Sequence, residues 1–388
     1  MPPISVLIKP ASGKCNLNCK YCFYHDVASN RAVADFGFMS LETIEEIIKK
    51  ALKFASGYAT FSFQGGEPTL CGLDFFKSVV ELQNKHNVNN AAFNNCIQTN
   101  GMLIDEKWAE FLHDNHFLVG LSLDGFDELH DAYRVDAKGK GTYAKVMETA
   151  TLFDKHKVEY NILFTVTGLS TQAPEKLYDF FKSKGCNFLQ FMPCIDPEDD
   201  KRGVHDYSLK PEQYTVFLKQ FFDKWCTDFM GGREVSVRYY DNLVRMVMGM
   251  QPEMCSLTGS CQCQFVFEAD GSVYPCDFYV TDEWKLGNIH RQELMELYES
   301  ETCQRFINSS LAAASLCCDC ESKYLCRGGC RRDRDNFSTK QLERNYFCQS
   351  YKDFLKYAYP RLGKVAEYVK DYHQKQKTAG ENTATTKG

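Results

Sequence analysis

Between residue 4 and about residue 230, short apolar runs alternate with longer segments in which apolar residues recur every three or four positions. The apolar runs predict strands at 5–9, 59–64, 91–99, 117–123, 159–166 and 187–193. The segments with helical spacing predict helices at 41–55, 72–86, 104–113, 143–155, 174–185 and 210–227. Six strand–helix repeats imply a parallel sheet with right-handed crossovers. This α/β pattern leaves open a doubly wound sheet or a full or partial barrel, and in both the ligands bind at the carboxyl ends of the strands.

After about residue 235 the segments become short, Gly and Pro interrupt them, and cysteines become frequent. The run 265–280 predicts a hairpin that turns at Asp270 and Gly271. A further helix, rich in Tyr and Phe, is expected over 342–373. We therefore expect a core domain at 1–234, a cysteine-rich domain with a C-terminal helix at 235–373, and a polar, disordered tail at 374–388.

The bulk properties narrow the class of protein. The chain has 388 residues, of which 44% are hydrophobic and 25% charged, enough for a sizeable core. Its net charge of -6 argues against a nucleic-acid binder. We find no signal peptide and no apolar run of the ~18 residues that a membrane span requires. We therefore expect a cytoplasmic protein without a membrane partner, and nothing in the sequence requires more than a monomer.

Nineteen cysteines are a high number for this length, and in a reducing compartment clustered cysteines are more often metal ligands or catalytic groups than disulfides. Cys15, Cys19 and Cys22 form a C-x3-C-x2-C motif directly after the first expected strand. Three thiolates leave one iron of a four-iron cluster open to a non-protein ligand. Structural zinc needs four ligands, although a catalytic zinc on three cysteines stays conceivable.

This motif, with Tyr21 before its last cysteine, resembles the signature of the radical S-adenosylmethionine enzymes. In that family the amino and carboxylate groups of S-adenosylmethionine chelate the open iron, and the reduced cluster cleaves the cofactor to a 5′-deoxyadenosyl radical. The resemblance runs from residue 4 to about 230. It implies a partial (β/α)6 barrel, which periodicity alone cannot select.

The resemblance continues in "GGEP" after the second strand, "QTNG" after the third and "GLSLDG" after the fourth. It implies that the GGEP loop holds the methionyl amino group with backbone and Glu groups, that Ser122 and Arg134 contact the ribose and the methionyl carboxylate, and that Ile195 packs on the adenine. An Arg can bind a carboxylate bidentately. From the residues alone, an ordinary turn, a surface ion pair at Arg134 and a core position for Ile195 stay open. The implied cofactor-binding residues are Tyr21, Gly65, Gly66, Glu67, Ser122, Asp124, Arg134 and Ile195.

A second cysteine array has the core Cys317-x2-Cys320-x5-Cys326-x3-Cys330, which by itself fits a zinc ribbon or an iron–sulfur site. With its flanking cysteines the array resembles the SPASM extension of radical enzymes that modify peptides and proteins. The resemblance implies two auxiliary clusters, and with the first motif three [4Fe–4S] clusters. Their implied ligands are Cys255, Cys261, Cys276 and Cys330 for the first auxiliary cluster, and Cys317, Cys320, Cys326 and Cys348 for the second.

Several neighbours of these ligands have open roles. Cys263 and Cys318 adjoin implied ligands and could replace Cys261 or Cys317. Four arginines of the segment "CRGGCRRDR" could form a nucleic-acid patch, but we favour compensation of the clusters' negative charge. The scattered cysteines are interpreted as small core residues: Cys71, Cys96, Cys186, Cys194, Cys226 and Cys303.

Asp277 directly follows Cys276 and could be an ordinary solvated carboxylate. A carboxylate beside an electron-accepting cluster could instead take a proton while the cluster takes an electron. The segments "CNLNCKYCFY", "FQGGEPTL", "LQFMPC" and "QFVFEADGSVYPCDFYV" resemble the anaerobic sulfatase-maturating enzymes over nearly the whole chain. This resemblance implies that a Cys or Ser in a C/S-x-P/A-x-R motif of an unfolded sulfatase is oxidised to Cα-formylglycine. Asp277 would be the general base, Tyr24 and Gln64 would contact the substrate or pack behind it, and a flavodoxin or ferredoxin would supply electrons.

Two other functions are consistent with the sequence. One is a SPASM maturase that crosslinks or epimerises a precursor peptide, although Cys15 lies too near the start to leave room for the N-terminal recognition domain that many such enzymes carry. The other is a zinc-stabilised binding scaffold without enzymatic activity. The sequence does not choose between a Cys and a Ser substrate.

Overall fold

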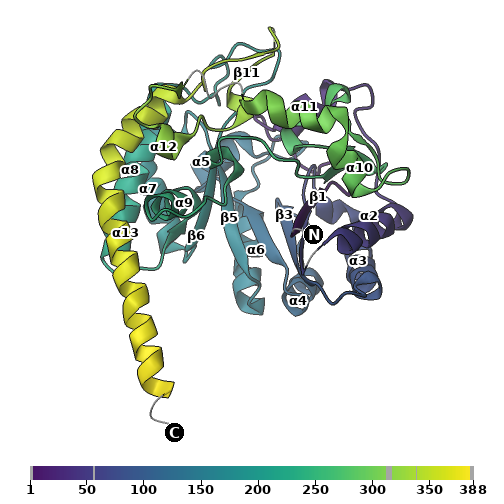
Figure 1. Cartoon of the computed structure of the whole chain (residues 1–388), viewed down its shortest axis with the longest axis horizontal. Helices are drawn as coiled ribbons and strands as arrows, with labels where there is room; N and C mark the ends of the chain where they lie inside the picture. Colours follow the sequence, from purple (N-terminus) through teal and green to yellow (C-terminus); the bar gives the residue numbers. More distant parts are fainter. Residues whose placement is uncertain (1–2, 56, 312–316, 338, 385–388) are drawn as a thin grey trace.

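The computed structural model describes residues 3–55, 57–311, 317–337 and 339–384 (Figure 1). Its main sheet contains the six predicted strands, each ending within one residue of the prediction. They are β1 (Ile4–Ile8), β2 (Tyr58–Phe63), β3 (Ala92–Thr99), β4 (Leu118–Ser122), β5 (Tyr160–Val166) and β6 (Phe188–Pro193). The six predicted helices are also present, within three residues at each end. They are α2 (Leu41–Phe54), α3 (Leu73–His86), α4 (Glu106–Asp114), α6 (Tyr143–His156), α7 (Pro174–Ser183) and α8 (Pro211–Met230).

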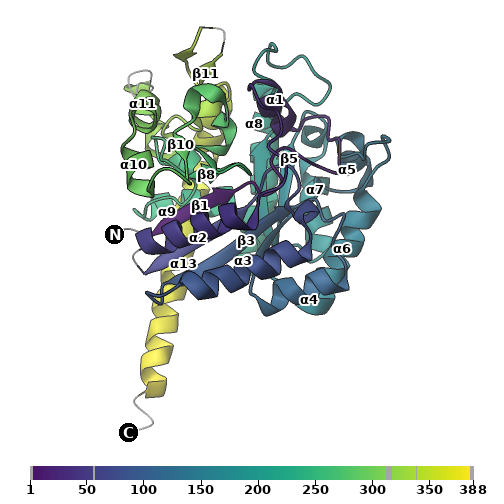
Figure 2. The ribbon, with the colours of Figure 1, turned by 90° about the vertical axis from the view of Figure 1, so that its right-hand side faces the viewer.

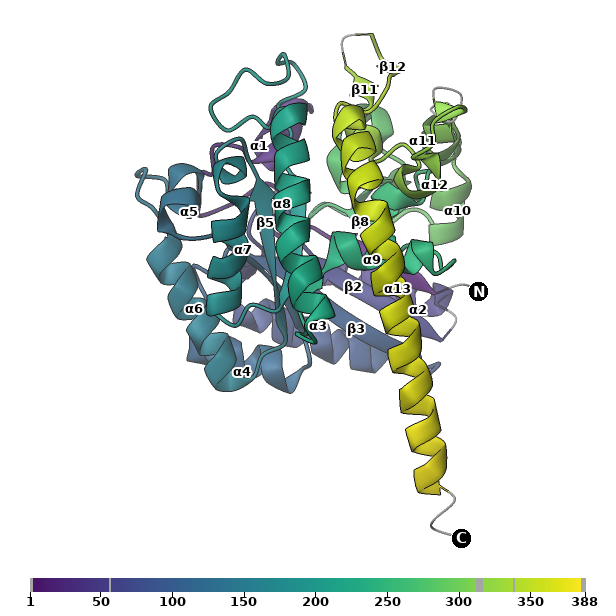
Figure 3. The ribbon, with the colours of Figure 1, turned by 90° about the vertical axis from the view of Figure 1, so that its left-hand side faces the viewer.

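The order of the strands decides between the architectures that the pattern left open. Strands β1 to β6 are parallel, and each pairs with the next in the chain, so their order never reverses. A doubly wound sheet needs such a reversal. Right-handed crossovers in one direction place the helices on one face, and Figures 2 and 3 show them around the outside of the sheet. The barrel is open because β6 pairs with β7 (Ser236–Val237) and not with β1.

Helix α2 shows how local sequence produces these elements. The side chain of Ser40 accepts a hydrogen bond from the Thr43 N–H and caps the first turn, as its residue type predicts. Ile44, Ile47 and Ile48 lie on one face and are fully buried. Six α-helices within the described residues had not been predicted: α1 (Phe23–Ser29), α5 (Asp127–Tyr133), α9 (Arg238–Val247), α10 (Leu294–Glu299), α11 (Glu301–Ser310) and α12 (Lys323–Cys326). Each has ten residues or fewer, too short for a clear periodic signal.

The predicted hairpin is present and extends the main sheet. Strand β8 (Val266–Phe267) pairs antiparallel with β9 (Ser272–Tyr274), and Gly271 turns the chain with a φ of 80°. Strand β8 also pairs in parallel with β1, and β10 (Gly287–Asn288) follows β9 at the far edge. Strand β7 belongs to the same sheet at its opposite edge. The main sheet therefore includes strands from both sides of residue 234, where we expected the boundary between the two domains.

The C-terminal helix differs from its prediction at both ends. Helix α13 (Cys348–Ala384) begins six residues later than expected, because Leu342 lies in β12 (Gln341–Leu342), which pairs with β11 (Asp335–Asn336). It also continues through most of the tail that was predicted to be disordered, whose last residues, 385–388, lie outside the described part. The prediction of disorder was wrong because Gln, Lys, Ala and Glu favour a helix and no proline follows Pro360. Helix α13 packs along α8 (Figure 3). Within the described ranges, no helix has both the length and the apolar character needed to cross a membrane.

Candidate active site and cluster sites

The loop that follows β1 gathers Cys15, Cys19 and Cys22 at the carboxyl end of the sheet. Burial, together with the smaller effect of neighbouring thiolates in the set, raises the pKa of Cys15 to about 11 and that of Cys19 to about 12. The three sulfur atoms are therefore close enough to repel one another when ionised. Such a set is stabilised by a positively charged metal group that takes up the thiolate charge.

The GGEP loop packs directly against this cysteine loop. The Glu67 N–H donates to the Lys14 carbonyl at 2.8 Å, and a Cβ at Gly66 would lie 2.1 Å from that same oxygen. Gly66 also has a φ of 39°, so it is required by a close approach of two loops and not by a simple turn.

Glu67 is buried and accepts four hydrogen bonds from within the protein. The donors are the N–H and hydroxyl of Thr69, the hydroxyl of Thr99 and the N–H of Asn100. The carboxylate thus ties the loop after β2 to the loop after β3. Most of the acceptor capacity of this carboxylate is thus used within the protein, and the contact of the loop with the methionyl amino group stays a prediction.

Asp124 and Arg134 form a buried ion pair at the end of β4, so the surface ion pair considered for Arg134 is wrong. Arg134 Nη2 donates to Asp124 Oδ1 at 3.0 Å, and the Tyr21 hydroxyl donates to the other oxygen. Arg134 Nε lies 2.9 Å from Asp124 Oδ2, but among the described residues no acceptor is aligned with its N–H. Ser122 accepts a hydrogen bond from Gln98. An unpaired buried guanidinium N–H beside three cysteines fits an anionic ligand such as a carboxylate.

Ile195 follows β6 at the same edge of the sheet and is only partly buried, so it is not a plain core residue.

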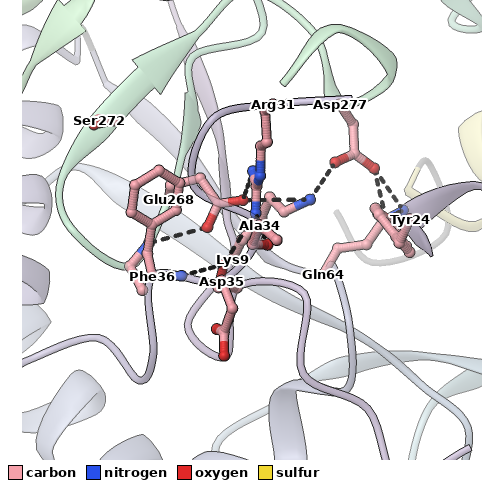
Figure 4. A network of polar contacts seen from close by, with 12 residues as sticks. Lys9, Tyr24, Arg31, Ala34, Asp35, Phe36, Gln64, Glu268, Ser272 and Asp277 are labelled. Atoms are coloured by element: carbon pink, nitrogen blue, oxygen red, sulfur yellow. Dashed lines mark hydrogen bonds and ion pairs between the residues drawn. The ribbon is translucent and has the colours of Figure 1, made fainter. Parts of the chain in front are cut away.

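The predicted base and substrate contacts converge (Figure 4). The Tyr24 hydroxyl donates to Asp277 Oδ2 at 2.5 Å, and the Gln64 amide donates to the Tyr24 oxygen at 2.9 Å. Asp277 is only 7% exposed, so the alternative that it is an ordinary solvated carboxylate is wrong. Burial, and then the charge of Asp277, raise the pKa of Tyr24 well above its usual value, which keeps its hydroxyl as a donor.

The auxiliary cysteines fall into two groups whose members influence one another's pKa values. The thiolates of Cys255 and Cys261 raise the pKa of Cys276, and those of Cys255 and Cys276 raise the pKa of Cys330, in each case after the larger effect of burial. In the second group, the other three thiolates raise the pKa of Cys326 after burial. One pocket is lined by all four members of the second group, Cys317, Cys320, Cys326 and Cys348.

The two spare cysteines have other partners. Cys263 forms a hydrogen bond with the buried Cys303, and Cys318 is exposed and contacts Asp319. Within the described ranges, no three His, Cys, Asp or Glu side chains lie close enough together to bind a single metal ion, an arrangement that a four-iron cluster does not need because each cysteine binds a different iron.

Comparison with known proteins decides the family. The radical SAM superfamily model matches residues 10–182, and an iron–sulfur cluster-binding domain model matches residues 258–321. A cysteine-type anaerobic sulfatase-maturating enzyme of Clostridium perfringens is 50% identical over 95% of this chain and 100% of its own length. The chain belongs to the anaerobic sulfatase-maturating enzymes. The serine-type enzyme of Bacteroides thetaiotaomicron is 33% identical over 93% of this chain and 90% of its own. The solved structure of native anSMEcpe with bound AdoMet and Cp18Cys peptide superposes with a TM-score of 0.91, at 49% identity, over 95% of this chain and 100% of the other.

This maturating enzyme is therefore a radical SAM enzyme, and the prediction of [4Fe–4S] clusters and S-adenosylmethionine as its cofactors is confirmed. The residues present fit both. Three cysteine groups supply soft thiolate ligands, and the Nε–H of Arg134, for which no acceptor among the described residues is aligned, would donate to the carboxylate of the cofactor.

In this maturating enzyme the arginines of "CRGGCRRDR" are mostly buried, which excludes a nucleic-acid patch for Arg331, Arg332 and Arg334. Arg331 donates to the Phe306 carbonyl at 2.9 Å and lies 4.8 Å from the centre of the Trp284 ring. Arg334 lines the pocket of the second cysteine group. Compensation of cluster charge fits these positions.

Sequence reasoning missed two buried residues that support the site. His130 Nδ1 accepts a hydrogen bond from the Asp124 N–H at 3.2 Å. On the other side of the ring, Nε2 lies 3.0 Å from the Thr142 hydroxyl, and that hydroxyl donates a hydrogen bond to the Arg134 carbonyl. Lys9 forms an ion pair with Asp277 at 3.4 Å. A lysine at the end of an apolar strand was a visible signal for Lys9, but the sequence held no signal for His130.

Proposed function

We propose that this enzyme oxidises a cysteine in the maturation motif of an unfolded sulfatase to Cα-formylglycine. The observation that carries the proposal is the position of Asp277, whose carboxylate adjoins the cluster ligand Cys276 and faces Tyr24 and Gln64 at the mouth of the barrel. Base and electron acceptor are thus neighbours in the chain. The solved structure of the related anSMEcpe contains a bound Cys peptide, which supports a peptide as the substrate of this enzyme.

The chain's own residues would act mainly as base and as binding groups. When bound, S-adenosylmethionine and the first cluster would supply the 5′-deoxyadenosyl radical that takes a hydrogen atom from the substrate Cβ, and an auxiliary cluster would accept the electron that leaves the substrate. Asp277 would take the thiol proton as that electron leaves, so that a C=S bond forms; water would then add to this carbon and the sulfur would leave as hydrogen sulfide, which gives the aldehyde. Tyr24 and Gln64 hold Asp277 Oδ2 by hydrogen bonds and line the place where the thiol would enter.

The relatives favour cysteine over serine as the target. Cysteine-type enzymes of Clostridium perfringens and Clostridium novyi are 50% and 46% identical to this chain, against 33% for the serine-type enzyme of Bacteroides thetaiotaomicron. The proposal also includes a flavodoxin or ferredoxin as electron donor, a monomeric state and a cytoplasmic location, each of which rests on the sequence.

One anaerobic reaction tests this function. Reconstituted enzyme is incubated with dithionite, S-adenosylmethionine and matched peptides that carry Cys or Ser in the motif. We expect 5′-deoxyadenosine together with an aldehyde, which mass spectrometry detects as the exchange of H and SH for one oxygen. 5′-Deoxyadenosine with an epimerised or crosslinked peptide, and no aldehyde, would instead support a maturase of precursor peptides.

Asp277→Asn tests the base. We expect about 10²- to 10⁴-fold slower aldehyde formation, the range of general acid–base catalysis, while 5′-deoxyadenosine still forms. Asp282→Asn is the matched control, because Asp282 lies five residues further on and contacts the Ala32 N–H outside the site. Full activity of Asp277→Asn would remove Asp277 from the base role.

A further inference from the structure

Lys9 is a fully buried lysine, 2% exposed, directly after β1. Its ammonium lies 3.4 Å from Asp277 Oδ1, 3.8 Å from Glu268 Oε1 and 4.3 Å from the centre of the Tyr24 ring (Figure 4). A buried ammonium is tolerated only where opposite charges compensate its desolvation. Lys9 therefore belongs to the same cluster as the proposed base.

The backbone around Lys9 leaves room for its side chain. A Cβ at Gly65 would lie 2.7 Å from Lys9 Cε and 2.9 Å from Lys9 Cγ, and Gly65 has a φ of 86°. Any side chain at Gly65 would thus displace the lysine. On the other side, the Lys9 N–H donates to the Phe267 carbonyl of β8 at 2.8 Å. Lys9 is held by the barrel core and by the cysteine-rich half at once.

The other partner of Lys9 is already neutralised. Glu268 is fully buried and forms a 2.7 Å ion pair with Arg31, which is also held by the Ala34 carbonyl and the Ser12 hydroxyl. Arg31, Glu268, Lys9 and Asp277 therefore form a row of alternating charges. Because Arg31 balances Glu268, the charge of Lys9 is left for Asp277.

We propose that Lys9 is a positioning residue that fixes the orientation of the Asp277 carboxylate for the reaction. This inference rests on the proposed role of Asp277 as base. Lys9 holds Oδ1, while Tyr24 and Gln64 hold Oδ2 from the opposite side. The carboxylate torsion of Asp is otherwise broad, so without Lys9 the group can turn away from the entering thiol. Misplacement of a catalytic group by about 1 Å can cost about 10²-fold in rate.

Lys9→Met, a nearly isosteric change, tests the proposal in the reconstituted holoenzyme. We expect aldehyde formation to fall about 10- to 100-fold, with little change in the initial rate of 5′-deoxyadenosine formation and in the KM for the peptide. The amount of 5′-deoxyadenosine formed per aldehyde should therefore rise. Lys9→Met combined with Asp277→Asn should be no slower than Asp277→Asn alone, because residues that act through one another are not additive.

Lys50→Met is the matched control. Lys50 is also a buried lysine, but its ammonium donates to the carbonyls of Ile289 and Gln292 on the outside of the barrel. It should keep the normal ratio of the two products. The same rise of the ratio in Lys50→Met, a parallel loss of both products in Lys9→Met, or an additive double variant would each overturn the proposal.

If Lys9→Met does not fold, Lys9→Gln carries the test, because the amide ends one bond short of the ammonium position. A raised ratio in Lys9→Gln supports the role, and an unchanged ratio refutes it. The activity of the wild-type enzyme distinguishes a failure of this inference from a failure of the proposed function. Absence of aldehyde from the wild-type protein with every sulfatase peptide would refute the function itself, whereas an unchanged ratio in an active variant refutes only the role of Lys9.

Discussion

The buried imidazole of His130 should make the loops that hold the cofactor sensitive to pH. Its ring is fully buried and links Asp124 to the Thr142 hydroxyl, and Thr142 in turn holds the Arg134 carbonyl. Burial lowers the pKa of His130 to about 4, and the charge of Arg134 acts in the same direction, while Asp124 and Asp131 oppose it. The native state therefore requires the neutral ring, with Nδ1 as acceptor.

The sign and size of the effect follow from this pKa. An unfolded histidine has a pKa of 6.5, above the native value, so protonation favours opening of the native structure. The stability that His130 contributes is complete above pH 6.5 and is lost as the pH falls toward 4. Between the two pKa values the stability that His130 contributes falls by about 3 kcal/mol in total, and between about pH 7.5 and about pH 5.5 it falls by about 1 kcal/mol.

Amide hydrogen exchange of the segment 120–134 measures this local stability in the reconstituted enzyme. We expect the wild-type segment to lose about 1 kcal/mol of protection between about pH 7.5 and about pH 5.5, after correction for the intrinsic exchange rate. His130→Gln should be less protected at the higher pH, because the Asp124 N–H loses its acceptor, but its protection should not fall further with pH. His113→Gln, on the exposed end of α4, should keep the wild-type slope. Equal slopes in the wild type and in His130→Gln would refute the reasoning.

Three further outcomes test the cluster sites. Gly66→Ala would place a Cβ 2.1 Å from the Lys14 carbonyl, so it should abolish 5′-deoxyadenosine formation and lower the iron content by one cluster's share; normal values of both would contradict the loop contact. Arg334→Met removes a buried cation from the pocket of the second cysteine group, so a redox titration followed by electron paramagnetic resonance should give a lower auxiliary potential; an unchanged potential would contradict charge compensation. Anaerobic iron chelation should increase hydrogen exchange over 255–348 and leave β2 to β5 protected, because the cysteine groups tie distant segments together; equal loss in both regions would contradict this.

The sequence could predict the repeated elements, because each depends on its own periodicity. Strands β1 to β6 and their helices need only local alternation of apolar and polar residues. The partition of eight cysteines into two groups came from family resemblance, since spacing alone permits several partitions. The end of α13 was mispredicted because polar composition was taken to indicate disorder although its residues favour a helix.

The contacts that organise the site could not be predicted, because they join residues far apart in the chain. Lys9 and Asp277 are separated by 268 positions, and Tyr24 and Asp277 by 253. Neither the role of Glu67 as a brace nor the acceptor role of His130 leaves a local pattern. Each depends on which loops the parallel sheet brings to the same edge.

One short stretch of strand pairing places the base beside its partners. Strand β8 pairs in parallel with β1 through Leu7 and Ile8, the two residues before Lys9, and β9 returns from β8 toward Cys276 and Asp277. A slip of one residue between β1 and β8 would turn alternate side chains to the other face of the sheet. It would thereby separate Lys9 from Asp277 and shift Cys276 relative to the barrel mouth. The register by which β8 attaches the cysteine-rich half to β1 therefore also sets the distance between the proposed base Asp277, Lys9 and Cys276, the proposed cluster ligand.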